Sequence, residues 1–98
     1  MTPITLARIA QAVNGRLVGD DRTVDALTTD TRKLEADTSA SMLFVAIKGE
    51  NFDGNDYVAK AAALGARAAL VSRQSDAAIP QIVVADTERA LADLALVV

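Results

Sequence analysis

The sequence contains neither cysteine nor histidine. Without cysteine there are no disulfides, no thiolate metal ligands and no cysteine nucleophile. Without histidine there is no Ser-His-Asp triad, and the commonest zinc ligand and the commonest general base near neutral pH are both missing. The chain is therefore a poor candidate for a self-contained catalyst or for a zinc site.

The sequence also lacks the patterns that mark membrane proteins and nucleic-acid-binding proteins. It has no run of about 18 apolar residues that would span a bilayer, and Met1-Thr2-Pro3 does not begin the basic and then apolar pattern of a signal peptide. A formal net charge of -3 and a pI of about 4.7 argue against a nucleic-acid-binding surface. We therefore expect a cytoplasmic globular domain with neither a membrane nor a nucleic-acid partner.

The sequence does contain enough apolar residues for one small domain. Hydrophobic residues make up 51% of the 98 residues, which supports a packed core. The chain stops at Leu96-Val97-Val98, on the apolar stripe of its last expected helix and without a cap or a polar tail. We therefore expect residues 1–98 to be a single domain cut from a longer polypeptide. The alternative is a short natural chain whose last helix docks on a sheet.

Five apolar runs rich in β-branched residues predict strands. They cover residues 16–19, 24–29, 42–47, 66–72 and 81–85. The run 42–47 is the most apolar of the five, and we expect it to be a central buried strand. Small and polar residues predict loops over 33–41 and 48–56.

Helical spacing of apolar residues predicts three helices, over residues 6–13, 57–64 and 87–98. We expect Asp56 to cap the second helix. The third is expected to have an apolar face made of Leu91, Leu94, Ala95 and Val98, with Leu94 and Val98 exposed at the end of the chain. Strands separated by helical segments indicate an α/β fold, with a small mixed, partly parallel sheet flanked by helices.

Two polar patterns fail as cofactor sites. Gly49 and Gly54 have the glycine spacing of a phosphate-binding P-loop, but the Lys and Ser or Thr that should follow are replaced by Asn55 and Asp56. The two glycines are more simply turn residues between a strand and a helix. The acidic residues at positions 20, 21, 53 and 56 match no calcium-loop spacing, so we expect no metal site.

A third polar segment, residues 28–33, follows a predicted strand and has two interpretations. Its sequence is Thr-Thr-Asp-Thr-Arg-Lys, and hydroxyls beside a tandem Arg-Lys are suited to binding an anion. In the alternative interpretation it is a polar loop in which Asp30 pairs with Arg32 or caps a turn. The residues alone leave both interpretations open.

Together, the glycine pattern, the 28–33 segment and the strand between them carry a family resemblance. Residues 29–34 (Thr-Asp-Thr-Arg-Lys-Leu) and then 43–56 (Leu-Phe-Val-Ala-Ile-Lys-Gly-Glu-Asn-Phe-Asp-Gly-Asn-Asp) resemble the N-terminal domain of the Mur ligases. Residues 4–15 and 68–84 are similar to the same domain, so the resemblance covers nearly the whole chain. The chain departs from the family pattern in its longer 35–41 loop, and in Asn55 where the family usually has histidine.

The resemblance implies a role in the cytoplasmic stage of peptidoglycan synthesis, in cell-wall biogenesis. Mur ligases are three-domain, ATP- and Mg²⁺-dependent enzymes whose N-terminal domain holds the UDP end of the substrate. We expect the parent enzyme to be a monomer that adds D-Ala-D-Ala to UDP-N-acetylmuramoyl-tripeptide. The partners of this domain would be that substrate and the central and C-terminal domains, and no cofactor or catalytic residue would lie in residues 1–98. The alternatives are the same domain of the preceding ligase, which adds the third amino acid, or a non-enzymatic α/β interaction or regulatory module.

The resemblance also assigns site residues. Thr31 would donate a hydrogen bond near the UDP, and Arg32 would offset the charge of the pyrophosphate. The segment Lys48, Gly49, Glu50, Asn51 and Phe52 would line the uridine pocket, with Glu50 and Asn51 on polar edges of uracil or ribose and Phe52 packed on the base. Four residues are expected to shape the loops rather than to bind ligand, namely Asp30, Asp53, Gly54 and Asn55.

Overall fold

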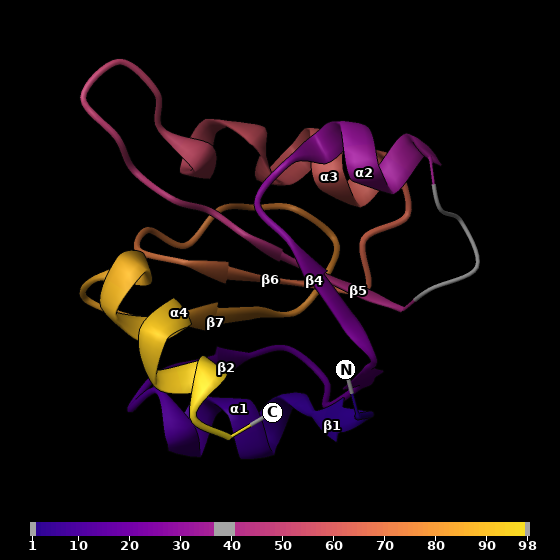
Figure 1. The fold of residues 1–98 in the computed structure, drawn as a ribbon. Helices are drawn as coiled ribbons and strands as arrows, with labels where there is room; N and C mark the ends of the chain where they lie inside the picture. The colour runs from indigo at the N-terminus through magenta and orange to yellow at the C-terminus, as the bar shows by residue number, and fades with distance from the viewer. Residues whose placement is uncertain (1, 37–40, 98) are drawn as a thin grey trace.

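A five-stranded sheet forms the centre of the protein, seen here in a computed structural model that describes residues 2–36 and 41–97 (Figure 1). The strand order is β2-β7-β6-β5-β4. The strands are β2 (Arg16–Val18), β4 (Ala26–Thr28), β5 (Met42–Val45), β6 (Ala68–Val71) and β7 (Gln81–Val83). β4, β5, β6 and β7 run parallel to one another, and β2 joins β7 antiparallel. The predicted α/β class with a partly parallel sheet is confirmed.

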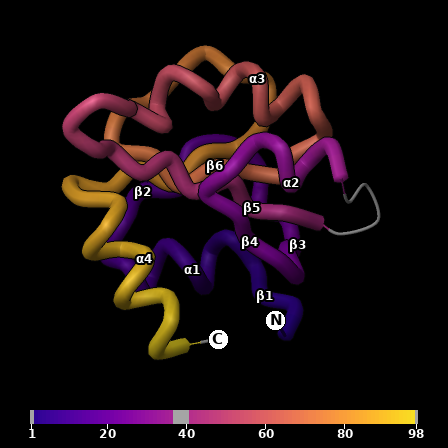
Figure 2. The backbone as a smooth tube through the Cα atoms, turned by 45° about the horizontal axis from the view of Figure 1, so that its top comes forward, coloured from indigo at the N-terminus to yellow at the C-terminus, as the bar shows by residue number. Residues whose placement is uncertain are grey.

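Helices cover both faces of this sheet (Figure 2). On one face lie α1 (Leu6–Ala12) and α4 (Thr87–Ala95), and on the other lie α2 (Thr31–Ala36) and α3 (Val58–Ala63). Successive residues of β5 face opposite layers, so Leu43 packs toward α1 and α4 while Phe44 packs toward α2 and α3. Both residues are fully buried, as expected for a strand covered on both faces. However, β6 rather than β5 is the middle strand.

The strand predicted over 24–29 is two strands in two sheets. β3 (Thr23–Val24) pairs with β1 (Ile4–Thr5) in a separate two-stranded sheet, and β4 belongs to the main sheet. Asp25 separates them, since its backbone N–H donates to the Ser41 carbonyl and its carboxylate accepts from the Ser41 N–H, both at 2.9 Å. These contacts turn the chain from one sheet into the other.

The loop predicted over 33–41 is wrong for its first part, because residues 33–36 continue α2. Leu34 is the reason, since its side chain is 2% exposed in the layer between α2 and the sheet. A single apolar residue among polar neighbours gave too weak a periodic signal to predict a helix. Residues 37–40, which belong to the segment longer than the family pattern, lie outside the described residues.

Two further helix predictions are corrected. Asp56 does not cap α3; instead Asp53 caps a 3-10 turn, η1 (Gly54–Tyr57), that leads into α3. In α4 the fully buried side chain is Leu94, which was expected to be exposed, whereas Ala95 is exposed and Val98 lies outside the described residues. Ala90 and Leu94, one turn apart, form the buried stripe because α4 packs beside α1.

None of the helices in the described ranges has the length and apolar character of a membrane span.

Candidate functional site

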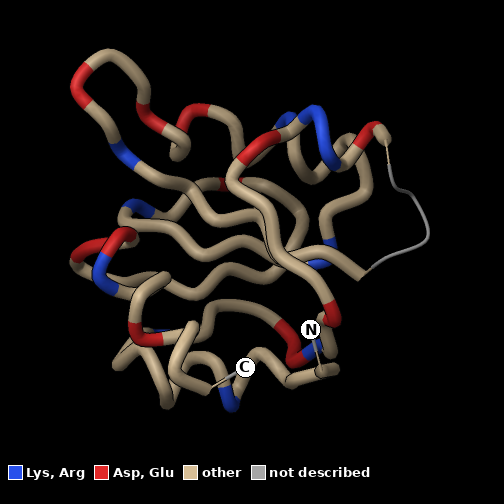
Figure 3. Tube along the Cα trace, in the orientation of Figure 1, with Lys and Arg blue, Asp and Glu red and all other residues tan. Residues whose placement is uncertain are grey.

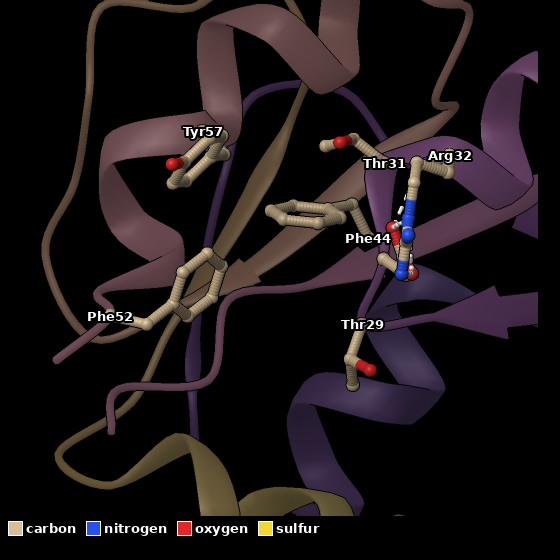
Figure 4. Close-up of a pocket in the computed structure, with 7 residues that line it drawn as sticks. Thr29, Thr31, Arg32, Phe44, Phe52 and Tyr57 are labelled. Atoms are coloured by element: carbon tan, nitrogen blue, oxygen red, sulfur yellow. Dashed lines mark hydrogen bonds and ion pairs between the residues drawn. The ribbon is translucent and has the colours of Figure 1, made fainter. Parts of the chain in front are cut away.

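A pocket of about 440 Å³ lies where β4 and β5 end (Figure 4). In open α/β sheets, ligands characteristically bind at the carboxyl ends of the strands. Here the connection from β4 to α2 forms one side, β5 forms the floor, and the segment from β5 to α3 forms the other side. The lining residues are Thr29, Asp30, Thr31, Arg32, Phe44, Phe52 and Tyr57.

The pocket has an aromatic side made by Phe52 and Tyr57. Their rings stack with centroids 5.0 Å apart and planes 22° apart, although 46% of Phe52 and 37% of Tyr57 is exposed. The fully buried Phe44 lies between this pair and Arg32 in Figure 4 and closes the floor. The chain has only two Phe, one Tyr and no Trp, so all its aromatic residues line this one pocket.

The opposite side carries the ion pair between Asp30 and Arg32. Arg32 Nη2 donates to Asp30 Oδ2 at 2.7 Å and Nε donates to the same oxygen at 3.0 Å, while the backbone N–H of Arg32 donates to Asp30 Oδ1 at 2.9 Å. The hydrogen bond from the Arg32 side chain is the main cause that lowers the pKa of Asp30 from 3.8 to about 2. The structure therefore confirms the alternative in which Asp30 pairs with Arg32 and caps the turn. The same pairing leaves an exposed arginine at the pocket edge, and anion binding by this segment stays a prediction.

The segment after β5 makes a tight turn whose tip points away from the pocket. The N–H of Gly49 donates to the carbonyl of Phe52 at 2.6 Å, and Lys48 forms an antiparallel bridge with Asp53. Glu50 and Asn51 lie exposed at the tip of this turn. Of the segment 48–52, only Phe52 lines the pocket.

Lys48 faces a different hollow. It lines a polar pocket of about 350 Å³ together with Ser72 and Asp86, which follow β6 and β7. The structure therefore brings Thr31, Arg32 and Phe52 together in one pocket and leaves Lys48, Gly49, Glu50 and Asn51 out of its lining.

The turn before α3 is anchored to the end of β6 by a buried amide. Asn55 is 6% exposed; its Nδ2 donates to Ser72 Oγ at 2.9 Å, and its Oδ1 accepts from the Ser72 N–H at 3.1 Å. Asn55 also donates to Asp53, which is the main cause of the lowered pKa of Asp53. Gly54 packs so closely that an added Cβ would lie 2.7 Å from the Cα of Ala46. This anchoring positions Tyr57 at the end of η1.

Three lining residues, Thr29, Phe44 and Tyr57, were not singled out by the sequence analysis. Thr29 and Phe44 stand inside the two segments that carry the family resemblance. Tyr57 stands just beyond them, and the signal that would have found it is the scarcity of aromatic residues. With only two Phe and one Tyr in the chain, each aromatic residue is a candidate for packing and for binding alike.

Charged residues of both signs lie on the two sides of the pocket (Figure 3). On the α2 side Arg32 and Lys33 stand with Asp30 and Glu35, and the segment after β5 carries Lys48 with Glu50, Asp53 and Asp56. The side chain of Arg32 is paired with Asp30 but is 86% exposed, so it is the cation of the pocket lining that a bound anion can reach. Within residues 2–36 and 41–97, no group of three or more Asp or Glu side chains is placed to hold a metal ion.

Comparison with known proteins identifies similar sequences. Residues 23–97 match the Mur ligase family, catalytic domain. The UDP-N-acetylmuramoyl-tripeptide--D-alanyl-D-alanine ligase of Escherichia coli is 48% identical over 95 residues, which cover 97% of this chain and 20% of the relative. The ligase of the same name from Haemophilus influenzae is 38% identical and also covers 97% of the chain and 20% of the relative.

A second group of relatives covers less of the chain. The UDP-N-acetylmuramoyl-L-alanyl-D-glutamate--2,6-diaminopimelate ligase of Bacillus licheniformis is 39% identical over 75 residues, which cover 76% of the chain and 14% of the relative. Among solved structures, a UDP-N-acetylmuramoylalanyl-D-glutamyl-2,6-diaminopimelate--D-alanyl-D-alanyl ligase from Acinetobacter baumannii superposes with a TM-score of 0.83 at 36% identity. That superposition covers 96% of this chain and 21% of the other. The chain thus spans about a fifth of the length of the D-alanyl-D-alanine ligases it matches.

Proposed function

The chain belongs to the Mur ligase family, and we propose that it binds the UDP end of UDP-N-acetylmuramoyl-tripeptide. The parent enzyme would be a cytoplasmic, monomeric ligase that adds D-Ala-D-Ala in peptidoglycan synthesis, with residues 1–98 as its N-terminal domain. Two observations favour this member of the family over the diaminopimelate-adding one. The Escherichia coli D-alanyl-D-alanine ligase matches 97% of the chain at 48% identity. The Bacillus licheniformis diaminopimelate ligase matches 76% of the chain at 39% identity.

The observation that carries the proposal is the pairing of an aromatic side and a cationic side in one pocket. A nucleoside diphosphate has the same two parts, a planar base and a charged diphosphate. Uracil would pack on the exposed ring of Phe52, because nucleobases stack on aromatic side chains. The diphosphate would lie on the α2 side, where Arg32 offers charge-assisted hydrogen bonds and Thr31 a hydroxyl.

The residues of this chain bind and orient the substrate. The family implies ATP and Mg²⁺, and together they would activate a carboxylate of the peptide for amide formation. The residues of this chain do not fit ATP and Mg²⁺. The sequence contains no Gly-Lys-Thr or Gly-Lys-Ser for the ATP phosphates, and the described carboxylates form no cluster that would hold a metal ion. The ATP and Mg²⁺ sites are therefore assigned to other domains of the parent enzyme. The chain alone is expected to be inactive.

An NMR titration of the 98-residue chain tests the proposal. UMP, and separately UDP-N-acetylmuramoyl-tripeptide, is added at millimolar concentration while the backbone amides are followed. We expect shifts at Thr31 and Arg32 on one side and at Phe52 and Tyr57 on the other, with none at the distant Arg89. Shifts confined to the polar pocket at Lys48 and Asp86, or no shifts at all, would show that the site is assigned wrongly.

A further inference from the structure

Tyr57 lies just outside the two segments that carry the family resemblance, yet it occupies a defined place in the pocket. The residue is 37% exposed, and its ring stacks on that of Phe52 with centroids 5.0 Å apart. In Figure 4 its hydroxyl points away from Phe44, so the ring rather than the hydroxyl faces the pocket interior. An exposed aromatic residue that packs on a second exposed aromatic residue contributes little to the core. Its contribution is to the position of its neighbour.

The two rings differ in how firmly the backbone holds them. Phe52 stands in the exposed turn 48–53, where its carbonyl accepts from the N–H of Gly49, and 46% of its surface is accessible. Tyr57 ends η1, where Asp53 caps the turn, Asn55 is bonded to Ser72, and the next residue begins α3. The stack therefore joins a weakly held ring to a firmly held one.

Ring position matters for binding because a side chain that must be ordered on binding weakens affinity. A lone exposed Phe52 would sample several rotamers, and only some of them present its face to the pocket. Contact with the Tyr57 ring restricts the rotamers open to Phe52. We infer that Tyr57 is a positioning residue that holds Phe52 ready to stack on a planar base, an inference that rests on the nucleotide-binding function proposed above.

The size of the effect follows from the strength of such pairs. The free energy of a stacked aromatic pair, beyond the area that it buries, corresponds to about a fivefold change in a binding constant. Tyr57→Leu, which keeps an apolar side chain but removes the ring, should weaken UMP binding by about fivefold. Ribose 5-phosphate, which has no base, should bind Tyr57→Leu and the unaltered chain equally. Tyr57→Phe should restore UMP binding, because the ring carries the effect.

The experiment measures UMP and ribose 5-phosphate affinity by NMR titration for the unaltered chain, Tyr57→Leu and Tyr57→Phe, with melting temperatures for each. Leu96→Ala is the control, since Leu96 is 88% exposed and does not line the pocket. In Tyr57→Leu the Phe52 ring signals should also lose the ring-current shift that the stack produces. Tyr57 is the single tyrosine of a chain without tryptophan, so UMP should change the intrinsic fluorescence while ribose 5-phosphate leaves it unchanged.

Two results would overturn the inference while leaving the proposed function intact. One is UMP affinity in Tyr57→Leu equal to that of the unaltered chain. The other is an equal loss of UMP and ribose 5-phosphate affinity together with a lower melting temperature, which would make Tyr57 a structural residue. If the unaltered chain itself fails to bind UMP, the nucleotide site is wrong, and this inference falls with it.

Discussion

The two sides of the pocket are held in place by different kinds of interaction. On the α2 side, Asp30 and Arg32 are two residues apart and are joined by charge, with the Arg32 side chain 86% exposed. On the aromatic side, Asn55 and Ser72 are 17 residues apart and are joined by neutral hydrogen bonds around a buried amide. The first arrangement is local and depends on ionisation. The second is tertiary and depends on close packing, so changes to the two sides should have different consequences.

Gly54→Ala should have the largest effect, because it disrupts the packed side. The added Cβ would lie 2.7 Å from the Cα of Ala46 and 2.8 Å from the backbone N of Ile47, so the backbone must move. Overpacking of this kind costs about 3 kcal/mol of the free energy of unfolding, and UMP affinity should fall as Tyr57 shifts. Thermal unfolding measures the loss.

Gly49→Ala is the matched control for that substitution. A Cβ at Gly49 would meet its nearest neighbour, the Phe52 carbonyl oxygen, at 3.7 Å, an ordinary contact. Its melting temperature should stay close to that of the unaltered chain. Equal losses in the two glycine variants would contradict the close-packing account of Gly54.

Asn55→Ala should have the next largest effect. It removes the buried amide that bonds Ser72, and it leaves the part-buried Ser72 N–H without its acceptor. Losing these bonds should lower the free energy of unfolding by about 2 kcal/mol. Asn51→Ala, at the exposed tip of the same segment, should be close to neutral. Denaturant unfolding of both variants gives the comparison, and a similar loss in each would mean that Asn55 is not the anchor.

Arg32→Ala should separate binding from stability on the α2 side. Its side chain is exposed and its partner is local, so the melting temperature should hardly change. UDP affinity should fall about tenfold, because a charge-assisted hydrogen bond to the diphosphate is lost. Arg89→Ala removes another exposed arginine that pairs within its own helix, and it should leave UDP affinity unchanged. A large drop in melting temperature for Arg32→Ala alone would make Arg32 structural.

Acidification should have the smallest effect and should act on the charged side. The pKa of Asp30 is lowered from 3.8 to about 2, mainly by the hydrogen bond from Arg32. The stabilisation from the carboxylate is therefore fully present above pH 3.8 and is lost as the pH falls toward about 2. The Arg32 amide signal should move over that range in the unaltered chain and should not move in Asp30→Asn. A midpoint at the ordinary value of 3.8 would contradict the ion pair.

Sequence patterns predicted the partly parallel sheet. Thr31, Arg32 and Phe52 were assigned to a site because their segments resemble a known family, and the structure brings all three to one pocket. Ligand binding by these residues stays a prediction. The partners of Asn55 could not be predicted, since the contact with Ser72 exists only when β5 and β6 lie side by side.

The sequence did not predict the short helix α2, nor did it indicate that Phe44 and Tyr57 line the pocket. α2 has six residues and one buried side chain, Leu34, so its periodicity was too weak to predict a helix. Phe44 was read as a core residue, which it is, but its register opposite Thr28 also places it on the pocket floor. Tyr57 was read as the start of a helix, and only the folded structure brings its ring against Phe52.

A structure of the chain bound to UDP shows whether the two segments on either side of β5 form one nucleotide site, with an aromatic side for the base and Arg32 for the diphosphate. We expect uracil on the ring of Phe52 and phosphate oxygens within hydrogen-bonding distance of Arg32 and Thr31. UDP bound with its base on α2, or in the polar pocket lined by Lys48 and Asp86, would contradict this expectation.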